Sequence, residues 1–219
     1  MTVLAIVGLK REAAIVAGPH VVPVIAGNSG ELQQRIEGAL DSDVRGIISI
    51  GIAGALSPEL EAGEAIIAER VVTSSESFET DAKWTGRLAG AIRDARIGAI
   101  LGRSNIADST DVKAALFESS GADAVDMESH IAALVAREKN LPFAALRVIS
   151  DRADHALPPA ALAAMKPNGG IALGRVLKSI ALKPTQIPAL MRTGRESEKA
   201  FTTLFRCRDI LRPRLGFPD

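Results

Sequence analysis

The sequence predicts an α/β fold of three layers, in which helices cover both faces of a central twisted sheet that is mostly parallel or mixed. Short aliphatic and β-branched segments alternate with longer runs of helix formers from residue 2 to about residue 155. Hydrophobic residues make up 47% of the 219 residues and charged residues 24%, so the chain can bury a sizeable core. Residues 46–50 carry no charge, which is typical of a strand covered on both faces.

The strands are expected where aliphatic and β-branched residues form runs bounded by glycine or polar residues. These runs cover residues 2–8, 20–26, 46–50, 65–73, 97–102, 122–125 and 143–149. The first run is followed at once by helix formers, so Glu12 falls at a strand-to-helix junction. It also lacks the charged leader and longer apolar region of a secretion signal, and we therefore expect a cytoplasmic protein.

The helices are expected between these strands, and polar residues predict their caps. The helical runs cover residues 31–40, 85–95, 111–119 and 127–140. Asn28 or Ser29 is expected to cap the first of them, and Thr110 or Asp111 the third. Polar residues predict surface loops over 74–84 and 103–110.

Residues 51–56, Gly-Ile-Ala-Gly-Ala-Leu, follow the third strand and are interpreted as a glycine turn. Small residues in such a turn let backbone N–H groups approach a ligand closely. The spacing fits neither a P-loop nor a dinucleotide-binding fingerprint, because no Gly-Lys-Ser/Thr follows and the third glycine is missing. A Gly-x-x-Gly turn without a ligand remains the alternative.

The chain changes character after Asp154, where helices are expected over residues 157–165, 170–182 and 187–211. We divide it into an α/β domain, residues 1–182, and a basic helical extension of the same domain, residues 183–219. Residues 183–214 carry eight Lys or Arg and three acids. From the residues alone, a solvated helix packed on the domain is favoured over a basic amphipathic helix that contacts an anionic membrane.

Composition argues against several other kinds of function. Aromatic residues make up 3% and Tyr is absent, which argues against a nucleic-acid surface of stacked aromatics. The single cysteine, Cys207, excludes an internal disulfide and a multi-cysteine metal cluster, and the three histidines have no metal-ligand spacing. We therefore expect no metal, no cofactor and no nucleic-acid partner.

Three carboxylates lie at three expected strand-to-helix junctions, which converge at one edge of a parallel sheet. Glu128 could accept hydrogen bonds from vicinal hydroxyls such as those of a ribose. Asp151 could donate a proton to a leaving group, and Glu12 could orient or deprotonate a nucleophile. Each acid also has a simpler explanation, as a first-turn acid near a positive helix end, as a cap, or as a solvated helix residue.

Residues 51–56, 125–129 and 147–154 resemble the ordered motifs of the superfamily of purine nucleoside phosphorylases and methylthioadenosine/S-adenosylhomocysteine nucleosidases. The resemblance covers about residues 1–155. It implies that Asp151 protonates the purine at N7 with Ser150 positioning it, and that Glu128 holds the ribose. It further implies substrate-binding roles for Met127, which packs on the sugar, for Gly51, Ile52, Ala53 and Gly54 on the nucleophile side, and for Asn105 and Ile106 beside the base.

Residues 9–13, 126–130 and 157–161, with the basic extension, resemble the hopanoid-associated phosphorylases more narrowly. This implies phosphorolytic release of adenine from adenosylhopane, with Lys10 and Arg11 binding phosphate as co-substrate. Ser49 stands where the phosphorylases often place an arginine, so a hydrolytic methylthioadenosine/S-adenosylhomocysteine nucleosidase remains an alternative. A non-catalytic, membrane-associated nucleoside-binding protein is a third. The resemblance also implies a homo-oligomer, and a lipid-linked substrate would bring the C-terminal helix into peripheral contact with the inner membrane.

Overall fold

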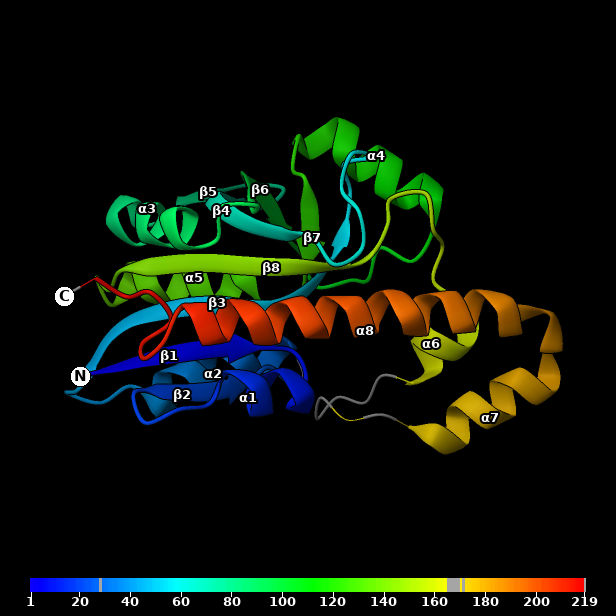
Figure 1. Cartoon of the computed structure of the whole chain (residues 1–219), viewed down its shortest axis with the longest axis horizontal. Coiled ribbons are helices and arrows are strands. Elements are labelled where there is room, and N and C mark those ends of the chain that lie inside the picture. Colours follow the sequence, from blue (N-terminus) through cyan, green and yellow to red (C-terminus); the bar gives the residue numbers. More distant parts are fainter. Residues whose placement is uncertain (28, 165–169, 171, 219) are drawn as a thin grey trace.

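The computed structural model describes residues 1–27, 29–164, 170 and 172–218, and one eight-stranded sheet runs through its centre (Figure 1). The strands are β1 (Thr2–Val7), β2 (Val21–Ile25), β3 (Val44–Ala55), β4 (Ala65–Val72), β5 (Ser77–Glu79), β6 (Arg96–Gly102), β7 (Ala124–Asp126) and β8 (Phe143–Asp151). Their order is β2-β1-β3-β7-β6-β4-β5, and β8 pairs with both β3 and β4. Since β3 pairs in parallel with β1 and β8 but antiparallel with β7, the sheet is mixed.

Five of these strands form a closed circuit of pairings. β3 pairs with β8, β8 with β4, β4 with β6, β6 with β7, and β7 returns to the far end of β3. The long strand β3 therefore belongs to two parts of the sheet: its first half pairs with β1 and its last two residues with β7. The end of β3 is thus surrounded by the ends of other strands.

Helices cover both faces of the sheet, which confirms the predicted α/β class. They are α1 (Lys10–Val16), α2 (Ser29–Ala39), α3 (Ala82–Ala91), α4 (Thr110–Ser120), α5 (Ser129–Glu138), α6 (Pro159–Ala164), α7 (Leu173–Leu182) and α8 (Ile187–Ile210), the last preceded by a 3-10 turn, Pro184–Gln186. Side chains of β1 alternate between the faces, as the pleat requires. Leu4 and Ile6 pack with α2 and α5, whereas Val3, Ala5 and Val7 pack with α1, α3 and α8.

The predicted glycine turn at residues 51–56 is wrong, because residues 51–55 complete strand β3. Glycine is a poor strand former, but here the backbone has partners on two strands. Gly51 to Ala53 are in register with residues 147–149 of β8, and Gly54 and Ala55 with β7. Tertiary pairing overrides the local preference.

The predicted loop over residues 74–84 is also wrong in part. Ser77–Glu79 forms the edge strand β5, antiparallel to β4. Trp84 is completely buried, packs edge-on against Phe217 with ring centroids 4.8 Å apart, and donates from Nε1 to the Leu215 carbonyl at 2.9 Å. The chain after α8 therefore completes the core beside α3.

Caps and helix ends agree with the sequence less well than the elements do. The cap of α4 is Ser109, whose Oγ accepts from the Val112 N–H at 3.3 Å, and not Thr110 or Asp111. The expected cap Asn28 and the expected helix end Met165 lie outside the described residues.

Helix α8 packs lengthwise on β8 and β3 (Figure 1). It buries Ala200, Phe201, Leu204 and Cys207 in the core cluster that also holds side chains of β1, β3 and β8. The division between residues 182 and 183 stays a prediction. Among the described residues, no helix is both long and apolar enough to cross a membrane.

Candidate active site

Three glycines on β3 and at the end of β1 make room for the three predicted acids. A Cβ on Gly8 would lie 2.9 Å from Glu128 Oε1, and one on Gly54 would lie 3.1 Å from Asp151 Oδ2. A Cβ on Gly51 would lie 2.7 Å from Glu12 Cδ. Gly51 and Gly54 are three residues apart on one strand, or about 10 Å at the rise of a strand.

Glu12 is buried at the first turn of α1 and ties this helix to β3. Its Oε2 accepts the N–H groups of Gly8 at 2.8 Å and Leu9 at 2.7 Å, and its Oε1 accepts the N–H of Ile52 at 2.7 Å. Burial raises the pKa of Glu12, while the nearby Arg147 guanidinium and the three backbone donors oppose the rise. The carboxyl group is thus fixed in place by three backbone donors.

Arg147 lies fully buried on β8 at the centre of an acidic cluster. Its Nε is 2.6 Å from Asp126 Oδ2 and its Nη2 is 3.3 Å from Glu128 Oε2. Nη2 also donates to Ser49 Oγ at 2.6 Å. One guanidinium therefore neutralises part of the charge of two carboxylates in a site from which water is largely excluded.

Glu128 precedes α5, and its carboxyl group does not cap that helix. Asp126 takes the capping role instead, because its Oδ1 accepts the Ser129 N–H at 3.1 Å. Burial raises the pKa of Glu128 to about 7; Arg147 opposes this rise, and the charges of Asp126 and Glu12 add to it. The Glu128 carboxyl group is thus directed toward Gly8 and Arg147, where it can accept hydrogen bonds from a ligand.

Asp151 ends β8 and is held from two sides. Lys113, a completely buried residue of α4, places Nζ 2.5 Å from Asp151 Oδ2. The same Nζ donates to the carbonyls of Arg152 at 2.6 Å and His155 at 3.0 Å, so its three donors have three acceptors. Ser150 Oγ donates to Asp151 Oδ1 at 2.8 Å, and its predicted role in positioning the base stays a prediction.

The other predicted residues are placed as follows. Met127 is half-buried, immediately before Glu128. Asn105 is exposed and Ile106 half-buried, in a loop whose Asp108 carbonyl accepts from the Leu157 N–H at 2.8 Å. That bond joins the loop to the segment that follows Asp151, but the roles of both residues stay predictions.

The two predicted phosphate ligands lie on α1, and both are exposed. Arg11 turns toward α8: its Nη2 donates to Glu198 Oε2 at 2.7 Å, and its guanidinium stacks 4.1 Å above the Phe201 ring. An anion at Arg11 would have to compete with Glu198. Phosphate binding by Lys10 and Arg11 stays a prediction.

Sequence reasoning assigned no role to Arg147 or Lys113. An arginine inside an otherwise apolar strand was a usable signal for the first, because a buried charge needs a partner. No comparable signal marks Lys113, which sits in a polar helix. Within the part of the chain that the structure describes, no group of three or more His, Cys, Asp or Glu could hold a metal ion.

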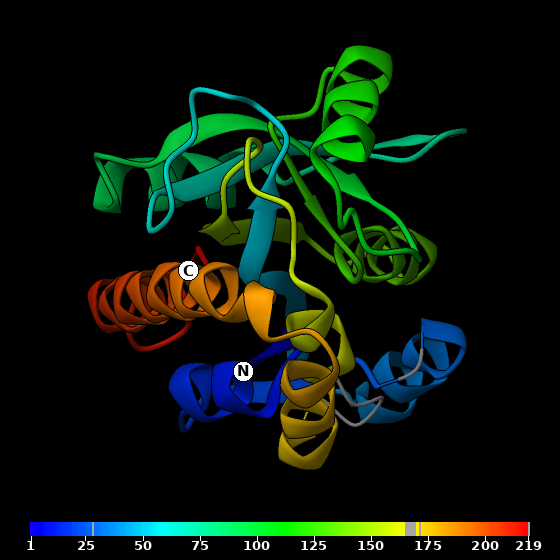
Figure 2. The same ribbon diagram turned by 90° about the vertical axis from the view of Figure 1, so that its right-hand side faces the viewer.

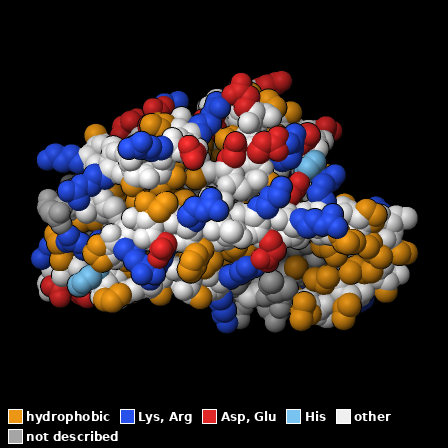
Figure 3. All heavy atoms as spheres, in the orientation of Figure 1, with side chains coloured by type: hydrophobic (Ala, Val, Ile, Leu, Met, Phe, Trp, Pro, Cys, Tyr) orange, Lys and Arg blue, Asp and Glu red, His pale blue; other side chains and the backbone are white. Residues whose placement is uncertain are grey.

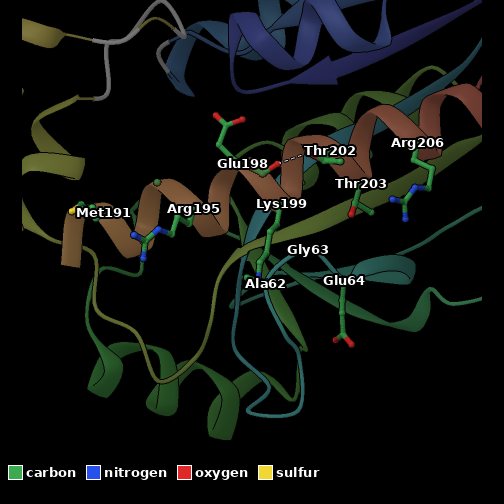
Figure 4. Close-up of a pocket in the computed structure, with 11 residues that line it drawn as sticks. Ala62, Gly63, Glu64, Met191, Arg195, Glu198, Lys199, Thr202, Thr203 and Arg206 are labelled. Carbon is green, nitrogen blue, oxygen red and sulfur yellow. Dashed lines mark hydrogen bonds between the residues drawn. The ribbon is translucent and has the colours of Figure 1, made fainter. Parts of the chain in front are cut away.

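A groove of about 1070 Å³ lies along α8 (Figure 4). Gly63 and Glu64 form one side of it, and Arg195, Lys199 and Arg206 project from α8 on the other. It contains none of the predicted catalytic or substrate-binding residues.

Comparisons with known proteins show the family and the fold. The family model described as the phosphorylase superfamily matches residues 21–180. The futalosine hydrolase of Helicobacter pylori superposes with a TM-score of 0.66 at 17% identity, over 94% of each chain. The methylthioadenosine/S-adenosylhomocysteine nucleosidase of Helicobacter pylori gives 0.65 at 17% identity, over 94% of this chain and 95% of that one. Its counterpart from Streptococcus pneumoniae, solved with a transition-state inhibitor, gives 0.64 at 16% identity, over 94% and 99%. None of the curated proteins matches the sequence.

Proposed function

Because the chain belongs to the phosphorylase superfamily, we propose that it cleaves the N-glycosidic bond of a purine nucleoside, with water as the attacking group. One observation carries the proposal: Glu12 and Asp151 each lie against a glycine of β3, and Glu128 lies against Gly8 at the end of the neighbouring strand β1. The glycosidic bond would lie between the acid that serves the base and the two that serve the sugar and the nucleophile. The solved structures compared above bear names of hydrolases and nucleosidases, in keeping with this reaction.

At the base, Asp151 first takes up a proton from solvent and then gives it to the departing purine. Ser150 and Lys113 hold its two oxygens on opposite sides, which fixes the direction of transfer. The Lys113 ammonium also stabilises the carboxylate that remains once the proton has left. The purine then leaves as a neutral base, which is a better leaving group than its anion.

At the sugar, Glu128 accepts hydrogen bonds from the ribose hydroxyls and stabilises the positive charge that develops on the ring. Glu12 orients the attacking water and takes its proton. Arg147 keeps the cluster folded by pairing with Asp126 and Glu128. Each acid thus has one task in a single displacement.

Water is favoured over phosphate because of the charges around Arg147. Glu12, Asp126 and Glu128 surround this one guanidinium, so a phosphate dianion would meet at least as much negative as positive charge. Of the two predicted phosphate ligands, Arg11 is paired with Glu198. A neutral nucleophile avoids both problems.

The test is adenine release from methylthioadenosine in buffer without phosphate, for the wild type and Asp151→Asn. We expect turnover that added phosphate does not change, and a loss of at least ~10²-fold in kcat for the variant. Asp154→Asn is the matched control, because Asp154 is a nearby exposed acid paired with Arg152. Unchanged turnover in Asp151→Asn would remove the assignment.

A second candidate is phosphorolytic release of adenine from adenosylhopane. Leu173, Leu177 and Leu182, which follow the site along the chain, are exposed, and a lipid-linked nucleoside would need an apolar surface nearby. An assay with adenosylhopane in detergent distinguishes the two, since phosphorolysis yields a sugar 1-phosphate only when phosphate is added. Nucleoside binding without turnover of any substrate would instead favour a non-catalytic protein.

A further inference from the structure

Helix α7 carries an apolar face that the described chain does not cover. Leu173, Val176, Leu177 and Ile180 recur at the spacing that places them on one side of a helix. Leu173 is 71% exposed and Leu177 68%, and α7 buries none of its residues. Leu182, at the end of the helix, is 77% exposed.

The first turns of α8 extend this surface. Ile187 is 40% and Met191 53% exposed. In Figure 3 the apolar side chains gather at the end of the molecule that holds α6, α7 and the start of α8, and Figure 2 looks onto that end. We call the side chains of Leu173, Leu177, Leu182, Ile187 and Met191 the apolar tip.

The charges of the segment that carries the apolar tip have one sign. Residues 172–195 contain five cations and no acid, the cations being Arg175, Lys178, Lys183, Arg192 and Arg195. The basic side chains continue along α8, where Arg195, Lys199 and Arg206 leave the helix on the same side (Figure 4). The tip is therefore an apolar surface carried by a positively charged segment, and the groove that Met191 lines holds three cations and the two acids Glu64 and Glu198.

Hydrogen bonds hold the apolar tip away from the core. Gln186 is buried at the junction of three helices: its Oε1 accepts the Ala160 N–H at 2.8 Å, and its Nε2 donates to the Ser179 carbonyl at 2.8 Å. These bonds join α6, α7 and the start of α8. The leucines of α7 are thus presented to the outside in a fixed arrangement and do not fold back onto the sheet.

We propose that the apolar tip docks on the surface of an anionic lipid bilayer. The leucine, isoleucine and methionine side chains would enter the boundary between headgroups and acyl chains, and the five cations would lie among the lipid phosphates. A second copy of the chain fits this surface less well, because a two-fold contact would bring the same five cations of each copy together. The proposal does not rest on the reaction that the protein catalyses.

The test is co-sedimentation of the full chain with vesicles of phosphatidylcholine alone and with vesicles that also contain phosphatidylglycerol. The variant Leu173→Glu/Leu177→Glu is compared with Ile210→Glu, which changes an exposed side chain at the opposite end of α8. We expect the wild type and Ile210→Glu to bind the anionic vesicles equally, and the double variant to bind at least about tenfold more weakly. Raised salt should also weaken binding. Thermal unfolding curves check that all three proteins are folded.

Three results would overturn the proposal. The double variant could bind anionic vesicles as well as the wild type does. The wild type could bind neutral and anionic vesicles equally well. The wild type could also bind neither kind of vesicle. In the third case, sedimentation velocity could show a wild-type dimer that the double variant loses while neither protein binds vesicles. That outcome would make the apolar tip an interface between copies of this chain.

Discussion

Replacing Lys113 with methionine removes a buried ammonium group while keeping the length of the side chain. Lys113 is completely buried, and its Nζ lies 2.5 Å from Asp151 Oδ2 and 2.6 Å and 3.0 Å from two backbone carbonyls. The substitution leaves the carboxylate unpaired and two carbonyls without their donor. Removing one partner of a buried pair costs about 3–5 kcal/mol, and we expect Lys113→Met to lower the free energy of unfolding by that amount.

The complementary change, Asp151→Asn, should cost less, about 1–3 kcal/mol, because the ammonium keeps its two carbonyl acceptors. The double variant removes both charges, so its loss should be smaller than the sum of the two single losses by about 1–3 kcal/mol. Urea unfolding followed by fluorescence provides the free energies of unfolding of the wild type, the two single variants and the double variant. Trp84 is the single tryptophan of the chain and is fully buried, so its emission reports loss of the core.

A matched cycle on an exposed pair separates a buried ion pair from a general effect of removing charge. Lys139 Nζ lies 3.8 Å from Glu37 Oε1 on the surface, and Lys139→Met with Glu37→Gln should give a coupling energy near zero. A coupling of less than about 0.5 kcal/mol between Lys113 and Asp151, with unchanged denaturant slopes, would refute the reasoning.

Three further predictions use other features of the site and the core. The pKa of Glu128 is raised from 4.5 to about 7. Its stabilising contribution is therefore full below pH 4.5 and is lost as the pH rises toward 7. Across this range, the free energy of unfolding should decline less steeply for Glu128→Gln than for the wild type. Gly51→Ala would place a Cβ 2.8 Å from Arg147 Nη1, and urea unfolding should show a loss of about 1–3 kcal/mol in the free energy of unfolding. The control is Gly90→Ala, in a helix where a Cβ would meet nothing within 4 Å, and it should be neutral or stabilising. Equal losses of free energy in the two variants would contradict the crowding at Gly51. Burial raises the pKa of Cys207 to about 11. A maleimide at neutral pH should therefore label the native protein at least ~10²-fold more slowly than the urea-unfolded protein. Equal labelling rates would place the thiol at the surface.

The sequence predicted the elements that have strong local patterns and missed those that depend on distant partners. The strands β1 and β8 are aliphatic runs, and both are found where expected. The end of β3 was interpreted as a turn, because its strand conformation depends on residues of β7 and β8 that come 69 or more positions later. Trp84 was placed in a surface loop, because it is buried by residues far along the chain. These are Leu215 and Phe217, which come 131 and 133 residues later.

The residues of the site also divide into those with a local sequence signal, which could be predicted, and those without one, which could not. Glu12, Glu128 and Asp151 could be singled out, because an acid at a strand-to-helix junction is visible in the order of local patterns. Lys113 could not, because its partner Asp151 is 38 residues away and a lysine in a polar helix usually faces solvent. Only the packing of α4 against the end of β8 identifies it as buried.

The glycines of β3 and at the end of β1 explain why the turn was misread, and they support the proposal that water is the nucleophile. In a phosphate-binding loop, glycines expose backbone N–H groups to an anion. Here the Ile52 N–H donates to Glu12 Oε1 at 2.7 Å, and the Gly8 N–H donates to Glu12 Oε2 at 2.8 Å. Side-chain carboxylates of the protein thus take the donors that a phosphate would need. The missing side chains at Gly8, Gly51 and Gly54 therefore make room for acids, and this crowding of acids is the reason why we propose water and not a second anion as the nucleophile.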